Sequence, residues 1–403
     1  MATLSAMRER LPAGFGDAVS LFVTMRVALG LVALYLWWRG GLPGPCHFEL
    51  ARNGWISVPP LADEGAAFPL VGVWQRWDAC WYTKIATYWY EPQELSVSFW
   101  PLFPLLTGLF APVFGFSPAL SGLVVSGVAY ITAMIGLYRL VARDVDPTTA
   151  RRAMIFLSIF PSAFFLFAPF TEALFLAGAV WTVVAARERR WFLAGAVGLL
   201  AGLTRIQGVF LVFPVGWEVA VAAGLTAWRP WRSLALPPID WGVIGRGLIA
   251  VGGPVVGFLA FISYTAVTVG QTPLDAQDAW GGKEFFPPWE VAAAAWAWAF
   301  EHDDPLQLLN LGLLVVFGGL LVVGARRLPI SYTLYALPQL LLVATRIQPT
   351  PLTSTSRLLI VLFPVFVVLA LIPWARVRLA WGITSVLFLG LLLAEFQRGT
   401  FVA

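Results

Sequence analysis

The sequence predicts an all-α, polytopic membrane protein, and three observations support this fold class. Of the 403 residues, 59% are hydrophobic and only 12% are charged, which is about half the charged share of a typical soluble domain. The apolar residues form runs of roughly 15–25 residues, the length that a helix needs to cross a bilayer. Many of the 20 tryptophans lie at the ends of these runs, where interfacial aromatic residues belong. We therefore expect one integral membrane domain over residues 1–403.

Apolar runs follow one another along the whole chain, and Pro or Gly interrupts many of them. They cover approximately residues 17–39, 98–116, 117–141, 153–169, 173–186, 191–205, 206–224, 245–267, 305–325, 329–345, 357–373 and 379–395. The first run lacks a small-residue cleavage site, so we expect a retained anchor rather than a cleaved signal peptide. The run at 98–116 contains three prolines, and we expect it to dip into the membrane or lie on it.

Arginine clusters between the runs orient the chain, because basic residues favour the cytoplasmic side of a membrane. The clusters are Arg8 and Arg10; Arg143, Arg151 and Arg152; Arg187, Arg189 and Arg190; Arg229 and Arg232; Arg326 and Arg327; and Arg376 and Arg378. All of them lie inside if every run except 98–116 crosses. This predicts about 11 transmembrane helices, with the N-terminus inside and the C-terminus outside.

This orientation brings the unusual polar residues to one side of the membrane. We expect a cytoplasmic tail (1–16), a first outer loop with interfacial helices (40–116), core helices (117–267), a second outer loop (268–304) and C-terminal helices (305–403). Polar turns at 170–172, 205–207 and 346–357 join the two loops on the outer side. Because none of these residues served to orient the chain, their convergence indicates one outward-facing site.

The first outer loop places a carboxylate among aromatic residues. Residues 71–90 read VGVWQRWDACWYTKIATYWY, and at helical spacing one face carries Trp74, Asp78, Trp81, Ile85 and Tyr88. The segment is too polar to cross, which predicts an interfacial helix on the outer leaflet. We expect its tryptophans to face lipid in part.

Asp78 has two interpretations, because an unpaired carboxylate on an apolar face is costly. It pairs with a structural partner, such as Arg76 or Lys84, or it is there for chemistry, since an acid at this depth is a functional candidate. Further candidates of the same site stand beside it in the sequence: Trp77, Trp81 and Tyr82.

Five segments resemble one known family in the same order, from about residue 74 to 370. They are RWDACWYTKIA (76–86), FWPLFPLL (99–106), FPSAFFLFAPFTEALFL (160–176), LAGLTRIQGVFLVFP (200–214) and SRLLIVLFPVF (356–366). Together they resemble the PIG-V-type mannosyltransferases, the GPI mannosyltransferase 2 family of the GT-C superfamily. The chain departs from the family at Ile206 and Ser356, where the family usually has Pro, and at Leu358, where it has Tyr. The second outer loop keeps only part of the family pattern.

The resemblance implies an enzyme that takes its sugar, mannose in this family, from a polyprenyl-phosphate or dolichyl-phosphate carrier. It implies that Asp78 is the catalytic acid of the first outer loop, where a carboxylate serves as general base. The leaving phosphate needs positive charge, which arginine supplies with its planar fork. Our candidates for this role are Arg205 and Arg357, with Arg346 as a third. A single displacement would invert the anomeric centre.

Several other residues leave two interpretations open. Thr171 and Glu172 form either a helix cap or, through Glu172, a substrate-binding acid. Arg205 and Gln207 form either a polar hairpin tip or part of the site, and Arg357 is either an interfacial anchor or a functional residue.

The chain offers few side chains for a metal or a disulfide. It has two histidines, His47 and His302, and no metal-ligand motif, so we expect no metal and no other cofactor. Its two cysteines, Cys46 and Cys80, both lie in the first outer loop. They form a disulfide if the loop is outside, or they remain thiols in a packed loop.

Partners and location follow from charge and composition. The net charge of +4 comes from short clusters between apolar runs, which indicates membrane orientation rather than nucleic-acid binding. Expected partners are membrane lipids, the lipid-linked donor and a glycolipid, glycan or protein acceptor. With only two lysines beside many arginines, we expect a bacterial plasma membrane with the site on its extracytoplasmic face. A lipid-linked sugar flippase or another transporter, and a non-catalytic partner in glycan assembly, remain alternatives.

Overall fold

The computed structural model describes residues 12–40, 42–43, 49–50, 54–55, 67–92, 95–115, 117–227, 239–279, 284–347 and 349–402, and it confirms the all-α fold class. Five helices are long and apolar enough to cross a membrane: α2 (Phe15–Trp38), α6 (Pro118–Asp144), α11 (Trp241–Thr268), α14 (Pro305–Arg327) and α18 (Ala375–Gln397). Within the described residues, the only strands are the short antiparallel pair β1 (Glu49–Leu50) and β2 (Gly54–Trp55).

Shorter helices complete the bundle. They are α7 (Pro147–Ser158), α8 (Glu172–Arg187), α9 (Trp191–Gly202), α10 (Val212–Ala222), α15 (Ile330–Ala344) and α17 (Phe363–Leu371). Each run that we predicted to cross therefore contains a helix, although only five helices reach full spanning length. The number of 11 crossings stays a prediction.

Caps in the sequence fix where several of the helices begin. The Ser117 hydroxyl accepts a hydrogen bond from the Leu120 amide at 3.3 Å before α6, and Pro118 follows it. Asp146 accepts from two amides before α7, and Asp240 accepts from one before α11. Each cap satisfies a backbone N–H that the helix itself leaves unpaired.

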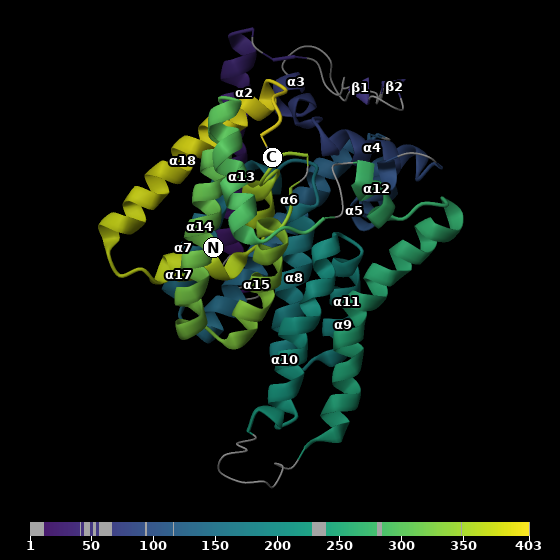
Figure 1. The fold of residues 1–403 in the computed structure, drawn as a ribbon, viewed down its shortest axis with the longest axis vertical. Helices are drawn as coiled ribbons and strands as arrows, with labels where there is room; N and C mark the ends of the chain where they lie inside the picture. Colours follow the sequence, from purple (N-terminus) through teal and green to yellow (C-terminus); the bar gives the residue numbers. More distant parts are fainter. Residues whose placement is uncertain are drawn as a thin grey trace, which may run out of the picture.

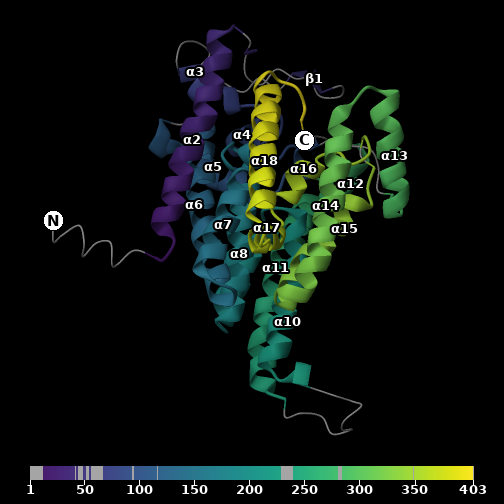
Figure 2. The same ribbon diagram turned by 90° about the vertical axis from the view of Figure 1, so that its left-hand side faces the viewer.

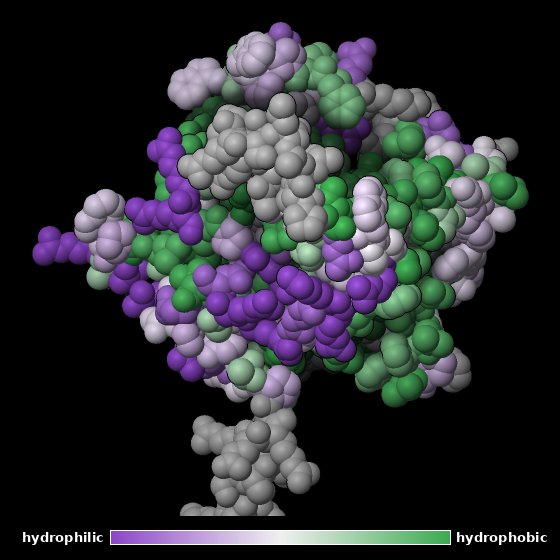
Figure 3. Space-filling view, turned by 90° about the horizontal axis from the view of Figure 1, so that it is seen from below, coloured by the Kyte–Doolittle hydropathy of each residue, from purple (hydrophilic) through white to green (hydrophobic). Residues whose placement is uncertain are grey.

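The bundle has two distinct ends (Figures 1 and 2). The short helices α3 (Ala67–Leu70), α4 (Asp78–Tyr88), α5 (Leu102–Phe110), α12 (Pro273–Ala279) and α13 (Pro288–Glu301) lie in its upper half. Helices α10 and α11 reach furthest toward the lower end. Seen from that end, a band of hydrophilic residues crosses the face (Figure 3). The described arginine-rich turns between α6 and α7 and between α8 and α9 carry the exposed Arg143, Arg189 and Arg190.

The segment 98–116 forms the short helix α5 and the 3-10 turn η3 (Ala111–Phe114). The nine residues of α5 rise about 14 Å, less than half of the ~30 Å apolar core of a bilayer. It packs against α4 so closely that a Cβ at Gly108 would lie 2.8 Å from the carbonyl oxygen of Ala86. The expectation that 98–116 does not cross stays a prediction.

The motif loop differs from the continuous interfacial helix that we predicted over 71–90. The 3-10 turn η1 (Gly72–Trp74) comes first, Trp77 then adopts a left-handed φ of 52°, and α4 begins at Asp78. The expectation that its tryptophans face lipid in part is wrong for Trp74 and Trp81, which are 1% and 2% exposed. Trp74 packs on Phe396 and Trp81 stacks on Phe99, because α18 and the α5 region cover this face.

Two predicted apolar runs, 153–169 and 357–373, are helical over only part of their length. Helix α7 ends at Ser158, and the chain continues to α8 through the 3-10 turn η4 (Ala163–Leu166). Helix α15 ends at Ala344, and the chain reaches α17 through the short helix α16 (Thr355–Leu359). The Ser162 hydroxyl donates to the Ser356 carbonyl at 2.7 Å and joins the two segments. Irregular backbone inside a membrane protein is tolerated when protein surrounds it, and most of both segments is buried.

Helices α9 and α11 touch through glycines. A Cβ at Gly253 would lie 2.0 Å from the carbonyl oxygen of Gly195, and one at Gly257 would lie 2.2 Å from that of Leu199. Small residues let membrane helices approach to backbone contact. The closely packed α9 and α11 support the turn after α9, which carries Arg205.

We expect Gly253→Ala to separate α9 from α11 and to destabilise the protein by about 1–3 kcal/mol, the usual range for overpacking. The measurement is the thermal unfolding midpoint of purified protein in detergent. Gly252→Ala is the matched control, since a Cβ there meets nothing within 4 Å. Equal midpoints for both variants would contradict the proposed close packing.

Candidate active site

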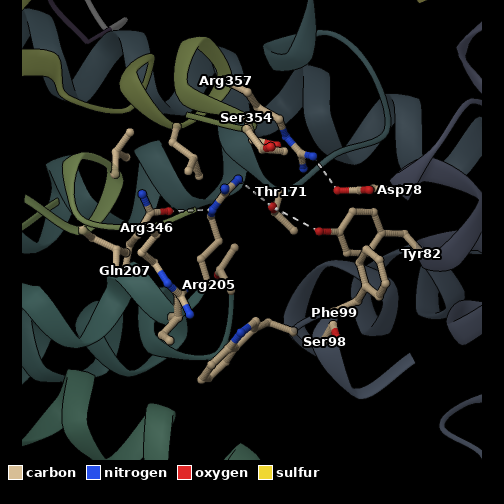
Figure 4. Close-up of a pocket in the computed structure, with 17 residues that line it drawn as sticks. Asp78, Tyr82, Ser98, Phe99, Thr171, Arg205, Gln207, Arg346, Ser354 and Arg357 are labelled. Carbon is tan, nitrogen blue, oxygen red and sulfur yellow. Dashed lines mark hydrogen bonds and ion pairs between the residues drawn. The ribbon is translucent and has the colours of Figure 1, made fainter. Parts of the chain in front are cut away.

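A cavity of about 260 Å³ opens within the bundle, and Figure 4 shows the residues that line it. Helix α4, the segment before α5, the start of α8, the turn after α9, the end of α15 and the region of α16 all contribute to it. Its lining consists of Asp78, Tyr82, Ser98, Phe99, Trp100, Thr171, Thr204, Arg205, Ile206, Gln207, Leu342, Val343, Arg346, Thr353, Ser354, Arg357 and Leu358. The cavity thus brings together the motif loop and the polar turns that the sequence placed on one side.

Asp78 and Arg357 meet at this cavity although 279 positions separate them. Arg357 Nη1 donates to Asp78 Oδ2 at 2.5 Å. The side chain of Arg357 is 8% exposed and that of Asp78 is 25% exposed. The carboxylate therefore has a charged partner and still reaches the cavity.

Glu172 pairs with two arginines of the cavity and is itself outside the cavity lining. Its side chain is fully buried, and Oε1 accepts from Arg205 Nη1 at 2.5 Å and from Arg357 Nε. Neither sequence interpretation of this turn describes that arrangement. In the described structure Thr171 makes no capping hydrogen bond, and the lining set excludes Glu172. Glu172 is thus a positioning residue for the two arginines.

Arg205 is fixed by further hydrogen bonds at the cavity wall. Its Nη1 donates to Thr171 Oγ1 at 3.1 Å, and its Nε donates to Gln207 Oε1 at 2.8 Å. Thr171 Oγ1 also lies 3.4 Å from the Tyr82 hydroxyl. The Arg205–Gln207 turn is therefore part of the site rather than a free hairpin tip.

Arg357 stays charged despite its burial. A guanidinium is protonated at all ordinary pH values, and two carboxylates, Asp78 and Glu172, pair with this one. The guanidinium also lies over the rings of Phe165 and Phe170, at 5.1 and 4.7 Å from their centroids, a favourable geometry for a cation. Arg357 is thus a buried cation of the site and not an interfacial anchor.

Arg346 is the third arginine of the cavity and differs from the other two. Its guanidinium lies 5.6 Å from the centroid of the Phe285 ring. Among the described residues it has no carboxylate partner, and burial lowers its pKa. Three arginines thus face two carboxylates around the cavity, and this excess of positive charge favours an anionic ligand.

Most of the remaining candidates of the motif loop are absent from the described cavity lining, namely Arg76, Trp77, Trp81 and Lys84. Arg76 donates to the carbonyls of Pro43 and Gln397, and Lys84 lies 3.7 Å from Glu91. The partner of Asp78 is therefore Arg357 and not one of its neighbours in sequence. Trp77 packs on Phe401. Tyr82 does line the cavity, and burial and Asp78 raise its pKa, so the phenol stays protonated.

Other predictions about this loop have separate outcomes. Cys80 is disulfide-bonded, and Cys46 lies outside the described residues. Within the described part of the chain, no group of three or more His, Cys, Asp and Glu side chains is placed to hold a metal ion. The expectation of a reaction without metal or other cofactor stays a prediction.

Sequence reasoning missed several residues of the cavity wall. Ser98, Phe99 and Trp100 belong to it, and their position next to the FWPLFPLL motif was the available signal. Ser354 adopts a left-handed φ of 61°, which nothing in the sequence indicates because serine rarely takes this conformation.

Comparison with known proteins gives one family match. Residues 97–249 match the sequence profile of dolichyl-phosphate-mannose-protein mannosyltransferases, which covers well under half of the chain. The matched part includes Glu172 and Arg205 but neither Asp78 nor Arg357. No curated protein sequence matches the chain.

Among solved structures, the chain is similar to the oligosaccharyltransferase of Archaeoglobus fulgidus. Its apo form aligns with a TM-score of 0.47 and 14% identity, over 95% of this chain and 56% of that one. The complex of this enzyme, AglB, with an inhibitory peptide and a dolichol-phosphate aligns with a TM-score of 0.46 and 12% identity, over 94% and 56%. The chain spans little more than half the length of these structures. A likeness this distant carries no inference about function.

We expect Glu172→Gln to destabilise the protein by about 3–5 kcal/mol, because it leaves two arginines without their shared buried carboxylate. The measurement is the thermal unfolding midpoint in detergent. Glu91→Gln is the control, since the Glu91 side chain is 52% exposed and such surface pairs contribute about 0–1 kcal/mol. A midpoint for Glu172→Gln that equals the control would contradict the positioning role.

Proposed function

We infer that this chain is an inverting glycosyltransferase of the GT-C type. It moves a sugar, mannose in our proposal, from a polyprenyl-phosphate carrier to a hydroxyl group of a glycolipid, glycan or protein acceptor. The reaction takes place on the extracytoplasmic face of a bacterial plasma membrane. The observation that carries this proposal is a partly exposed carboxylate, Asp78, at the wall of a cavity that also contains three arginines.

The family match supports the choice of substrate class. The matched profile describes proteins that transfer mannose from dolichyl phosphate, and the matched residues supply Thr171, Arg205 and Gln207 to the cavity wall. The sequence motifs at Asp78 and Arg357 lie outside the match and resemble those of the PIG-V-type mannosyltransferases.

The proposed reaction is a single displacement. The acceptor oxygen attacks the anomeric carbon while its proton passes to the Asp78 carboxylate, which acts as general base. A new glycosidic C–O bond forms and the bond from the anomeric carbon to the phosphate oxygen breaks. The bonding electrons leave with the phosphate, so the products are the glycosylated acceptor and the free polyprenyl phosphate.

The arginines stabilise the charge that develops on the leaving phosphate. Arg205 and Arg357 are held in fixed positions by Glu172, so they need little rearrangement as charge builds up. Arg346 adds a positive charge that no described carboxylate offsets. Arginine pairs with phosphate oxygens through two parallel N–H bonds, which also orients the donor.

Tyr82 and Thr171 connect the base to the phosphate-binding side. The Tyr82 hydroxyl lies 3.4 Å from Thr171 Oγ1, which in turn accepts a hydrogen bond from Arg205. Both side chains line the cavity, where their hydroxyl groups can bind sugar hydroxyls between the base and the arginines.

We expect Asp78→Asn to lower the rate of sugar transfer by about 10²–10⁴-fold, the usual contribution of a general base. The assay uses purified protein, polyprenyl-phosphate mannose and an envelope lipid extract as acceptor source. Glu91→Gln, in the same loop and outside the cavity lining, should retain activity. Full activity of Asp78→Asn would exclude Asp78 as the base.

We expect Arg346→Gln to raise the KM for the lipid-linked donor by roughly tenfold, since a charged group on a phosphate contributes about 1.5–3 kcal/mol at most. The fall in kcat should be smaller, because Arg205 and Arg357 remain. Steady-state kinetics with varied donor concentration measures both. Arg326→Gln is the control, because Arg326 is exposed in the last turn of α14 and is not in the cavity lining. A loss confined to kcat would contradict a role in donor binding.

A further inference from the structure

The proposed base is not free in this structure. Asp78 Oδ2 accepts from Arg357 Nη1 at 2.5 Å. This carboxylate oxygen is therefore occupied by the guanidinium and does not face an acceptor hydroxyl on its own. The same arginine is a ligand for the donor phosphate in the function proposed above. One guanidinium thus serves two anions, and the two roles need to be separated in time.

One edge of the Arg357 guanidinium is held by Glu172, and the other edge faces the cavity wall. Its Nε donates to the buried Glu172, and its Nη1 points to Asp78 at the cavity wall. The cation–π contacts with Phe165 and Phe170 fix the plane of the guanidinium. A phosphate that enters the cavity therefore meets an arginine that stays in place while the Asp78 side chain is free to turn away.

The charges around the cavity favour this exchange. Arg205 and Arg357 share the carboxylate of Glu172, and Arg357 has Asp78 as its second anion. Arg346 lies in the same cavity without a carboxylate partner among the described residues. It supplies the first attraction for the phosphate, and the phosphate then competes with Asp78 for Arg357.

We propose that the donor phosphate releases the base, by taking Arg357 Nη1 away from Asp78 when it binds. Asp78 then accepts the proton of the acceptor hydroxyl as the glycosidic bond forms. After the polyprenyl phosphate leaves, Asp78 loses this proton to water and pairs with Arg357 again. This inference rests on the proposed function and adds an order to it: the donor binds before the base is active, so the empty enzyme holds no free base.

The proposal makes a prediction that a purely structural ion pair does not make. If Asp78 competes with the phosphate for Arg357, removal of the Asp78 charge strengthens binding of the phosphate. Glu172 carries the same charge on the other side of Arg357, but it holds the arginines in place, and its removal weakens binding. Simple relief of electrostatic repulsion would strengthen binding in both variants.

The experiment measures the Kd of radiolabelled undecaprenyl phosphate, the carrier without sugar, by scintillation proximity with purified protein in detergent. We expect Asp78→Asn to bind it roughly tenfold more tightly than the unaltered protein, which corresponds to about 1.4 kcal/mol. We expect Glu172→Gln to bind it more weakly. Glu91→Gln should leave the Kd unchanged, and size-exclusion profiles check that each variant is folded.

Each outcome bears on one proposal. Unchanged or weaker binding by Asp78→Asn would overturn the release of the base, while the glycosyltransferase proposal would stand. Tighter binding by both Asp78→Asn and Glu172→Gln would also overturn it, since repulsion alone explains that result. Should Glu172→Gln not fold, the effect of Asp78→Asn in an Arg357→Gln background decides, because competition for Arg357 then gives no tighter binding, whereas relief of repulsion still does. No binding by the unaltered protein would count against the glycosyltransferase proposal itself.

Discussion

The architecture of the site depends on one buried carboxylate. Glu172 is fully excluded from solvent, and its Oε1 accepts from both Arg205 and Arg357. A buried charge is very costly unless opposite charges and hydrogen bonds compensate for it. The three segments that carry these residues can therefore pack only in an arrangement that brings all three charges together. Asp78 joins them through Arg357, which ties the motif loop to the last third of the chain.

Irregular backbone provides the positions that these charges need. Helices α7 and α15 both stop short, and the segments that follow them meet at the hydrogen bond between Ser162 and the carbonyl of Ser356. A continuous helix would place side chains at fixed steps along its axis, whereas these turns direct Thr171, Glu172 and Arg357 toward one point. The interior of the bundle tolerates such backbone because the surrounding protein, and not lipid, contacts it.

The balance of charge at the cavity links stability to the proposed chemistry. Two arginines are compensated by two carboxylates, which keeps the empty site stable, and Arg346 adds the charge that favours an incoming anion. The same pairing that stabilises the empty protein holds Asp78 on Arg357. In the proposed function, the donor phosphate separates the base from Arg357, because a single guanidinium serves both anions.

The sequence by itself determined the membrane class, the helical fold, the convergence of the motif loop and the polar turns on one site, and most of the charged residues of the cavity. Apolar run length and arginine position carry this information, because both reflect the transfer of single residues between water and lipid. Only the tertiary structure decided that Asp78 pairs with Arg357, that Glu172 pairs with Arg205 and Arg357 outside the cavity lining, and that α4 begins at Asp78 instead of continuing a longer helix. These features depend on contacts between residues far apart in the chain. They also depend on the burial of Trp74 and Trp81 by α18 and the α5 region. The local spacing of residues encodes neither.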